Sequence, residues 1–412
     1  MFNNKKILEN RGVYIHVPFC VKKCAYCDFL SFPASSIMHR EYVDALIREI
    51  RFLEIKFPEI KFSKAPIQET SCQEGCFFDE KLDISSIFIG GGTPSIVEEM
   101  LIFDIMQAIY QTFSVREDAE ITIECNPGTI DENKIKFYKQ VGINRISFGL
   151  QSASDELLAR IGRIHTYHDF LSSYECARNA GFDNINIDMM SALPGQTLDM
   201  YKNDIQKIAK LNPEHISAYS LILEENTPLY EHIDLYPSLP DEEMERQMYY
   251  DTKKILLEHQ YHRYEISNYA KAGYECRHNK LYWERGDYMG FGLGAASFIQ
   301  GVRYKNTENM EEYMKKAGKE SVVCEQERLS KKDCMSEFMF LGLRESKGVC
   351  ANAFKAQFGV SIHEIFGNVL KKHIDQKLIY SYSLDKGRQI WYALTDYGVD
   401  ISNYVFSEYL LE

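Results

Sequence analysis

Residues 12–29 read GVYIHVPFCVKKCAYCDF, a short apolar run that leads directly into three closely spaced cysteines. The apolar part is rich in β-branched and aromatic residues, which is typical of a buried strand. Cys20, Cys24 and Cys27 follow in the pattern C-x3-C-x2-C. We therefore expect a strand that carries three thiol ligands on the loop at its carboxyl end.

Five more runs of this kind follow, and stretches with helical periodicity separate them. In these stretches apolar residues recur three or four positions apart, as at Tyr42, Leu46 and Ile50. Strands that alternate with helices predict an α/β fold with a parallel sheet. Six such units favour a partial (βα)6 barrel, and a doubly wound sheet is the alternative. The five further strands are expected at residues 84–89, 119–125, 144–150, 184–189 and 215–221.

The alternation stops near residue 300, so we expect two domains in the 412 residues, 1–300 and 301–412. Within the second, residues 331–412 show helical runs and then two short strands around Asp385-Lys-Gly387, an α+β order that resembles a winged helix. This part holds ten basic and ten acidic residues, too few positive charges for reading DNA. Residues 58–81 are polar and predict a surface insertion that carries Cys72 and Cys76.

The charge balance argues against nucleic acid as a partner. The chain has 47 Lys and Arg against 60 Asp and Glu, a net charge of -13 that repels a polyanion. Its start lacks the apolar core of a signal peptide, and no run has the 18 or so apolar residues of a membrane helix. We expect a cytoplasmic protein without membrane insertion, in which any membrane contact is peripheral and goes through a partner. Its eleven cysteines then serve as thiols or metal ligands.

Three thiolates so close in sequence favour an iron–sulfur cluster, because iron in such clusters prefers soft sulfur ligands. A structural zinc site would need a fourth Cys or His. His16 is the nearest candidate, but it lies inside the predicted strand. Three ligands would leave one iron of such a cluster open to another ligand.

Polar residues also close the later strands. Gly90-Gly-Gly-Thr-Pro-Ser95 follows the second strand, and its glycines permit close backbone approach to a ligand, although such a triplet is also an ordinary tight turn. Glu124, Gln151 and Asp188 end the next three strands, and Arg163 follows soon after Gln151. Because the carboxyl ends of parallel strands meet at one edge of a barrel, these groups predict a polar binding site there.

The cysteine triplet resembles that of the radical S-adenosylmethionine (SAM) superfamily. This resemblance implies a 4Fe–4S cluster on Cys20, Cys24 and Cys27, with SAM on the open iron and radical chemistry supplied by the cofactor. YIHVPFC, GGGTP, FGLQ and LPGQT resemble, more narrowly, the branch of oxygen-independent coproporphyrinogen III oxidase and its relatives. By this resemblance the SAM site is lined by Tyr14, Tyr26, Gly91, Gly92, Thr93, Glu124, Gln151, Arg163, Asp188, Ile222 and Ala296, and residues 290–297 close its far side.

Two departures separate the chain from the oxidases of that branch. Their motif has a further cysteine two positions after the third ligand, where this chain has Phe29, and their N-terminal extension has no counterpart ahead of Tyr14. His278-Asn-Lys-Leu-Tyr-Trp283 instead resembles the H-N-x-x-Y-W signature of haem chaperones in the branch. The resemblance implies a monomer or homodimer that binds haem and delivers it to recipient haemoproteins, with His278, Asn279, Tyr282 and Trp283 at the haem.

The chemistry of these residues is compatible with haem, since imidazole is a good axial ligand and the aromatic rings offer flat apolar faces. By composition alone, a His beside aromatic residues is more often a packing residue. Two other functions stay open from the sequence. One is the oxidative decarboxylation of coproporphyrinogen III to protoporphyrinogen IX, and the other is an iron–sulfur module without SAM chemistry.

Overall fold

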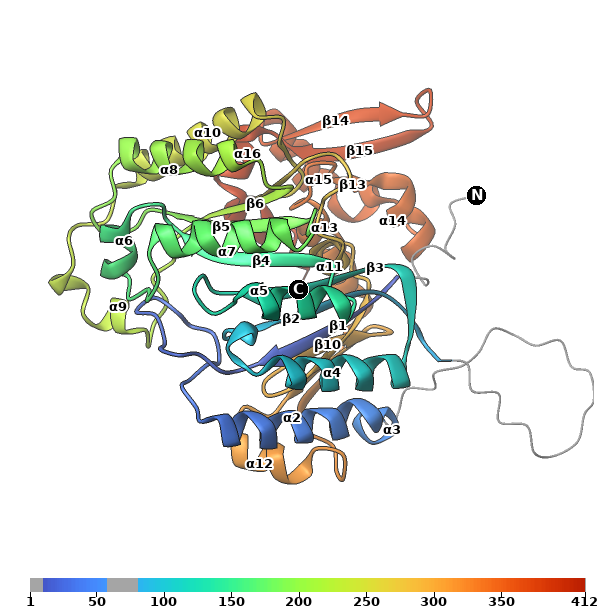
Figure 1. Ribbon diagram of the computed structural model, residues 1–412. Coiled ribbons are helices and arrows are strands. Elements are labelled where there is room, and N and C mark those ends of the chain that lie inside the picture. Colours follow the sequence, from blue (N-terminus) through green and yellow to red (C-terminus); the bar gives the residue numbers. More distant parts are fainter. Residues whose placement is uncertain (1–9, 58–80, 412) are drawn as a thin grey trace, which may run out of the picture.

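The computed structural model describes residues 10–57 and 81–411. Cys72 and Cys76 of the expected insertion lie outside the described residues. One curved sheet of twelve strands runs through the larger part of the molecule, helices cover its outer face, and a smaller group of helices and strands follows at the C-terminal end (Figure 1).

Six parallel strands form the centre of the sheet and lie side by side in chain order. This order confirms the six predicted strands, and the uninterrupted sequence from first to sixth is that of a partial barrel, because a doubly wound sheet reverses its order at a switch point. The strands are β1 (Arg11–Val17), β2 (Asp83–Gly91), β3 (Ser114–Cys125), β4 (Arg145–Gln151), β5 (Ile185–Ser191) and β6 (His215–Ser220).

Helices connect these strands, and several of them begin at a side chain that caps the first turn. Asp131, Thr166 and Thr197, for example, each accept a hydrogen bond from a backbone N–H in that turn. The connecting helices are α2 (Ser36–Arg51), α3 (Leu53–Lys56), η1 (Pro94–Ile96), α4 (Glu99–Thr112), α5 (Glu132–Gln140), α6 (Asp155–Arg160), α7 (Tyr167–Asn179) and α8 (Leu198–Leu211); α9 (Pro228–Glu231), η2 (Ile233–Leu235) and α10 (Glu242–Glu258) follow β6.

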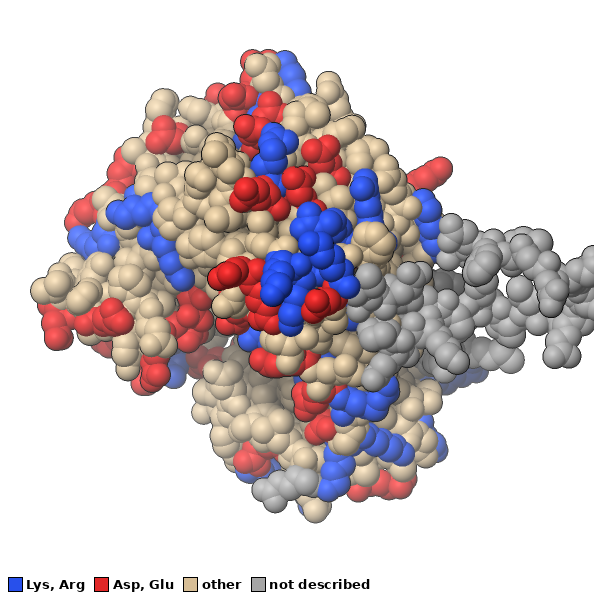
Figure 2. Space-filling view, turned by 90° about the horizontal axis from the view of Figure 1, so that it is seen from below, with Lys and Arg blue, Asp and Glu red and all other residues tan. Residues whose placement is uncertain are grey.

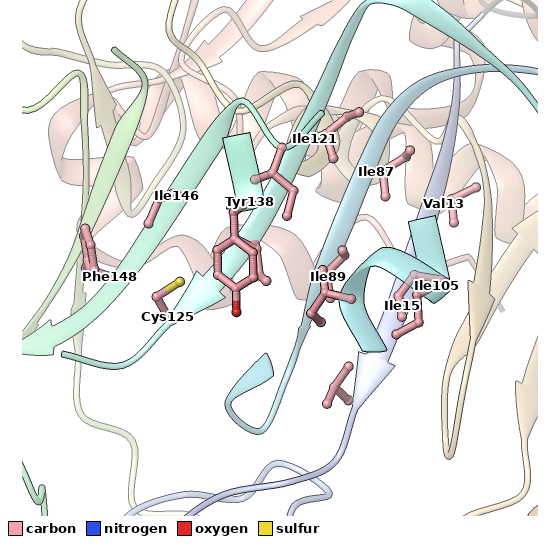
Figure 3. Packing of buried hydrophobic residues seen from close by; sticks show 14 of the residues in the cluster. Val13, Ile15, Ile87, Ile89, Ile105, Ile121, Cys125, Tyr138, Ile146 and Phe148 are labelled. Atoms are coloured by element: carbon pink, nitrogen blue, oxygen red, sulfur yellow. The ribbon is translucent and has the colours of Figure 1, made fainter. Parts of the chain in front are cut away.

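The two faces of the sheet differ in chemistry. On the outer face, Val13, Ile15, Ile87 and Ile89 are fully buried against the helices, as Figure 3 shows for this part of the core. On the inner face, the alternate positions of strands β2 to β6 carry buried polar groups. These include Ser86, Glu120, Arg145, Asn186 and His215. The barrel therefore has an apolar outer core and a polar interior.

Six further strands extend the sheet, and the sequence did not predict them. A seventh parallel strand, β9 (Asp287–Phe291), pairs with the free side of β1, and an antiparallel meander continues from it. Residues 290–297, expected to close the far side of the SAM site, are the end of β9, a turn and the start of β10. The meander strands are β10 (Ala296–Ile299), β11 (Val302–Asn306) and β12 (Val323–Arg328), with α12 (Met310–Lys316) between the last two; β7 (His262–Arg263) and β8 (Asn268–Ala270) lie at the other edge.

The sheet thus continues to Arg328, past the boundary at residue 300 that we expected. A second core begins at Met335, where Met339, Phe354 and Phe366 are buried together. Its elements follow the winged-helix order of helix, strand, two helices and hairpin. They are α13 (Lys331–Gly342), β13 (Val349–Cys350), α14 (Ala351–Phe358), α15 (Ile362–Asp375), β14 (Ile379–Leu384) and β15 (Gln389–Leu394), followed by α16 (Asp396–Asp400) and α17 (Ser402–Ser407).

Charged groups of both signs lie close together on the surface. On the face in Figure 2, one group of Lys and Arg side chains lies near the centre and is bordered by Asp and Glu side chains, and smaller groups of both signs are scattered around it. Ion pairs also join the C-terminal part to the barrel. Arg285 binds Glu337 at 2.9 Å with both side chains buried, and Lys347 binds Glu284 at 2.6 Å.

A buried carboxylate holds the β9 extension against the barrel. Glu49 of α2 accepts hydrogen bonds from Lys56 Nζ at 2.5 Å, from Gly292 N at 2.8 Å and from Tyr313 Oη at 2.6 Å. Burial lowers the pKa of Lys56, and the carboxylate opposes this shift. The charge of Lys56 therefore depends on Glu49, and the contacts tie α2 to β9 and α12.

Replacing Glu49 by alanine should lower the free energy of unfolding by about 3–5 kcal/mol, because it leaves the Lys56 ammonium buried without a counter-charge. Urea denaturation followed by circular dichroism measures the change. Adding Lys56→Met to Glu49→Ala should recover part of the loss. The matched control is Glu98→Ala, since Glu98 forms an exposed pair with Arg40 and its loss should cost about 1 kcal/mol or less. Equal costs for the two carboxylates would contradict this account.

Candidate functional site

The cysteine loop leaves β1 at Val17 and is fixed by backbone hydrogen bonds to the neighbouring strand ends. Gly92 N donates to Val17 O at 2.9 Å, and Thr93 N donates to Phe19 O at 2.7 Å. Farther along, Ala25 N donates to Ile161 O at 3.1 Å. The loop is therefore held at β2 on one side and beyond α6 on the other.

Two glycines after β2 allow this close approach. A Cβ atom on Gly92 would lie 2.6 Å from the carbonyl oxygen of Phe19, and one on Gly91 would lie 2.6 Å from the ring of His16. Gly91 also has a φ of 115°, which other residues rarely adopt. His16 is itself engaged, because its Nδ1 lies 2.9 Å from the Tyr14 hydroxyl and its Nε2 lies 2.9 Å from Leu30 O.

All three cysteines of the triplet line one pocket at the carboxyl ends of the strands. The pocket has a volume of about 110 Å³ between the thiols and the strand ends. Cys20 Sγ accepts from the Thr93 hydroxyl at 3.6 Å, and Cys24 Sγ accepts from Arg163 Nη1 at 3.6 Å. Three free thiols presented to one pocket from one loop fit the ligand set of an iron–sulfur cluster.

In residues 10–57 and 81–411, no three His, Cys, Asp or Glu side chains come close enough together to bind a single metal ion.

Arg163 connects the thiols to the strand ends. Its Nη2 donates to Asn126 Oδ1 at 2.7 Å and to the carbonyl oxygen of Gly149. Asn126 Nδ2 in turn donates to the Thr93 hydroxyl at 2.9 Å, which completes a chain of contacts from Cys24 to Cys20. Arg163 Nε is buried and has no hydrogen-bond partner within the described residues. The guanidinium therefore retains one free donor beside the pocket.

Two carboxyl groups lie deeper in the pocket. Burial, with a smaller contribution from Asp188, raises the pKa of Glu124 to about 8, and burial also raises the pKa of Asp188. Glu124 Oε2 accepts from Gly91 N at 3.0 Å, and Asp188 Oδ1 accepts from Asn186 Nδ2 at 2.7 Å. Gln151 ends β4 with a φ of 76° and accepts from the Tyr219 hydroxyl at 3.0 Å. Such a backbone conformation is costly for a residue other than glycine and is common at binding sites.

The structure brings together eight of the eleven residues expected to line the SAM site: Tyr26, Gly91, Gly92, Thr93, Glu124, Gln151, Arg163 and Asp188. Tyr14, Ile222 and Ala296 do not line this pocket. Tyr14 binds His16 inside the barrel, Ile222 is 69% exposed, and Ala296 starts β10. The sequence missed Asn126, Ser147, Gly149 and Tyr219 as lining residues. A strand period of two could have identified three of them. Ser147 and Gly149 precede Gln151 in steps of two and so share its face, and Asn126 follows Glu124 by two.

The expected haem residues lie on α11 (Arg277–Trp283) at the opposite, amino end of the barrel. His278 is 1% exposed, its Nδ1 lies 2.9 Å from Ser86 Oγ, and its Nε2 lies 2.8 Å from the Tyr282 hydroxyl. Burial lowers the pKa of His278 to about 3, so the ring is neutral. Both ring nitrogens of His278 are thus hydrogen-bonded within the protein in this conformation, and the assignment of His278 to haem stays a prediction. Asn279 and Trp283 are half-buried on the same helix.

Within the described residues, the helices are all too short or too polar to cross a membrane.

Gly92→Ala should remove most of the iron and sulfide that reconstituted protein retains. A methyl group there meets backbone atoms, so the cysteine loop must shift away from β2. Iron analysis and absorption spectra measure the effect. Gly367→Ala is the control, since this position in α15 has only one neighbouring atom, at 3.8 Å, and alanine favours the helix. Normal cluster content in Gly92→Ala would refute the close-approach argument.

Glu124 should make the cluster-free protein less stable as the pH rises from about 5 to about 8. Folded Glu124 holds its proton to about pH 8 and the unfolded group only to about 4.5, so the folded state binds more protons in this window and loses stability as pH increases. Glu124→Gln should remove this contribution. Urea midpoints of both proteins across the window give the difference, and parallel curves would contradict the assignment.

Comparisons with known proteins agree with this architecture. A family model described as the radical SAM superfamily matches residues 77–208, and one described as the HemN C-terminal domain matches residues 329–381. The solved structure of coproporphyrinogen III oxidase (HemN) from Escherichia coli superposes with a TM-score of 0.79 at 20% identity and covers 98% of this chain and 91% of that one. At this identity the likeness establishes the fold.

The sequence relatives are more similar. A protein named heme chaperone HemW from Lactococcus lactis is 36% identical over 402 residues, which cover 97% of each chain. The protein of the same name from Bacillus subtilis is 35% identical over 405 residues, 98% of this chain and 100% of that one. Since these alignments run through both the barrel and the C-terminal part, the chain belongs to the HemW family of the radical SAM superfamily.

Proposed function

We propose that this protein is a haem chaperone that binds haem, delivers it to recipient haemoproteins, and carries a 4Fe–4S cluster and SAM. The observation that carries the proposal is the identity of 36% with a protein named heme chaperone along nearly the whole of both chains. The pocket that joins three thiols to a polar strand-end rim supports the cofactor part.

Cys20, Cys24 and Cys27 would hold the cluster, since all three line the same pocket. When bound, the reduced cluster supplies an electron for cleavage of SAM. Gly91, Gly92 and Thr93 would bring backbone groups against SAM, while Arg163 and Gln151 would orient it by hydrogen bonds. Glu124 and Asp188 would accept hydrogen bonds from its hydroxyl or ammonium groups. The thiol positions depend on Thr93 and Arg163, which contact Cys20 and Cys24.

On the haem side, the motif on α11 would act as a unit. His278 fixes the helix through Ser86 and Tyr282, and the half-buried Trp283 at the end of the helix offers a flat apolar face. In this proposal His278 is a positioning residue. Asn279 and Tyr282 lie on the same helix, which presents Trp283.

An anaerobic titration of the cluster-loaded protein with haem, followed by absorption, tests the function. We expect saturable binding of one haem per chain and no conversion of coproporphyrinogen III by the same preparation. His278→Ala should weaken haem binding, because α11 loses its contact to β2, whereas His168→Ala should not, because the His168 side chain on α7 is exposed. Absence of saturable binding together with formation of protoporphyrinogen IX would refute the chaperone and establish the oxidase.

A further inference from the structure

A second pocket opens between the end of α11 and the C-terminal part of the chain. It has a volume of about 420 Å³. Its lining is mainly apolar and comes from both sides of the junction, and it includes Leu281, Trp283, Phe338, Val349, Cys350 and Trp391. We call this pocket the junction cleft. Both tryptophans of the chain line it. The pocket of the three cysteines, the cysteine pocket, lies at the other end of the barrel.

Each of the two indoles also contacts a side chain that does not line the junction cleft. The guanidinium of Arg344 lies 4.3 Å from the ring centre of Trp283, and Tyr382 lies 6.3 Å from Trp391 with the rings 20° from parallel. The indole N–H of Trp283 is buried and finds no acceptor in the described part of the chain. Fixed aromatic faces in a concave apolar pocket are the features that bind a flat apolar ligand.

Charged and sulfur groups accompany the apolar lining. Lys347 and Arg285 line the junction cleft, and Lys347 is 44% exposed although it contacts Glu284 and Glu345. Burial raises the pKa of Glu345, which weakens its competition for a cation. Cys350 lines the junction cleft as a free, buried thiol, and none of the described lining residues is a histidine. A thiolate is an established axial ligand of haem iron.

We propose that the junction cleft is the seat of haem, with the porphyrin against Trp283 and Trp391, a carboxylate directed to Lys347, and Cys350 as the sulfur ligand of the iron. The inference rests on the proposed haem-chaperone function and gives it a location. It also explains the motif on α11, since one short helix places His278 inside the barrel and Trp283 in the junction cleft.

Filling the junction cleft tests the location without removing a polar group. Ala353 lines it from α14, so Ala353→Trp should weaken binding of haem and of metal-free protoporphyrin IX about tenfold or more in the cluster-loaded protein. Ala356→Trp is the matched control, because Ala356 is exposed one turn later on the same helix. Cluster content and SAM binding should stay normal in both variants, which shows that they fold.

Cys350→Ser tests the ligand separately. It should shift the Soret band of bound haem while leaving affinity for metal-free protoporphyrin IX unchanged, since only haem offers an iron to the thiol. An unshifted spectrum would overturn the assignment of Cys350. If wild-type protein binds haem and Ala353→Trp binds it equally well, the junction cleft is not the seat and the chaperone function stands. If wild-type protein binds no haem, the proposed function itself fails.

Discussion

The buried carboxylate of Glu120 closes the amino end of the barrel. It accepts hydrogen bonds from the backbone N–H groups of Arg277 and His278, both at 3.1 Å, and from the thiol of Cys276 at 3.4 Å. A carboxylate at a helix start satisfies N–H groups that have no partner within the helix. Through this contact α11 covers the polar interior at the amino end of the barrel. The carboxyl ends of the strands stay open, and the cysteine pocket lies there.

The same strand serves both ends of the barrel. Glu120 and Glu124 lie four positions apart on β3, so both face the interior; the first holds α11 and the second reaches the cysteine pocket by accepting from Gly91 N. α11 in turn presents Trp283 to the junction with the C-terminal part. A rigid strand thus connects the cysteine pocket to the junction cleft.

Much of this could be predicted from local signals. The apolar runs predicted the six central strands. The ends of three of these strands predicted Gly91, Glu124 and Asp188 as site residues, because parallel strands bring such residues to one edge. β9 escaped prediction because the short strands β7 and β8 and the short helix α11 lead into it, which breaks the βα rhythm, and because Gly290 stands near its end. Tyr14, Ile222 and Ala296 do not line the cysteine pocket, and their positions depend on how the strands and loops pack at the mouth of the barrel. His278 resembled a free ligand because Ser86, its partner, lies 192 positions away in the sequence, and the junction cleft exists only once two distant parts of the chain pack together.

Transfer of haem is the central claim and is most directly tested by mixing the haem-loaded, cluster-containing protein anaerobically with an excess of an apo-haemoprotein. The two proteins are then separated by size and the haem absorption of each is recorded. The account predicts that haem leaves this chain, appears in the recipient at its native spectrum, and does so faster than haem dissociates in the absence of a recipient. Haem that stays on the chain, or that reaches the recipient only at the rate of free dissociation, would contradict it.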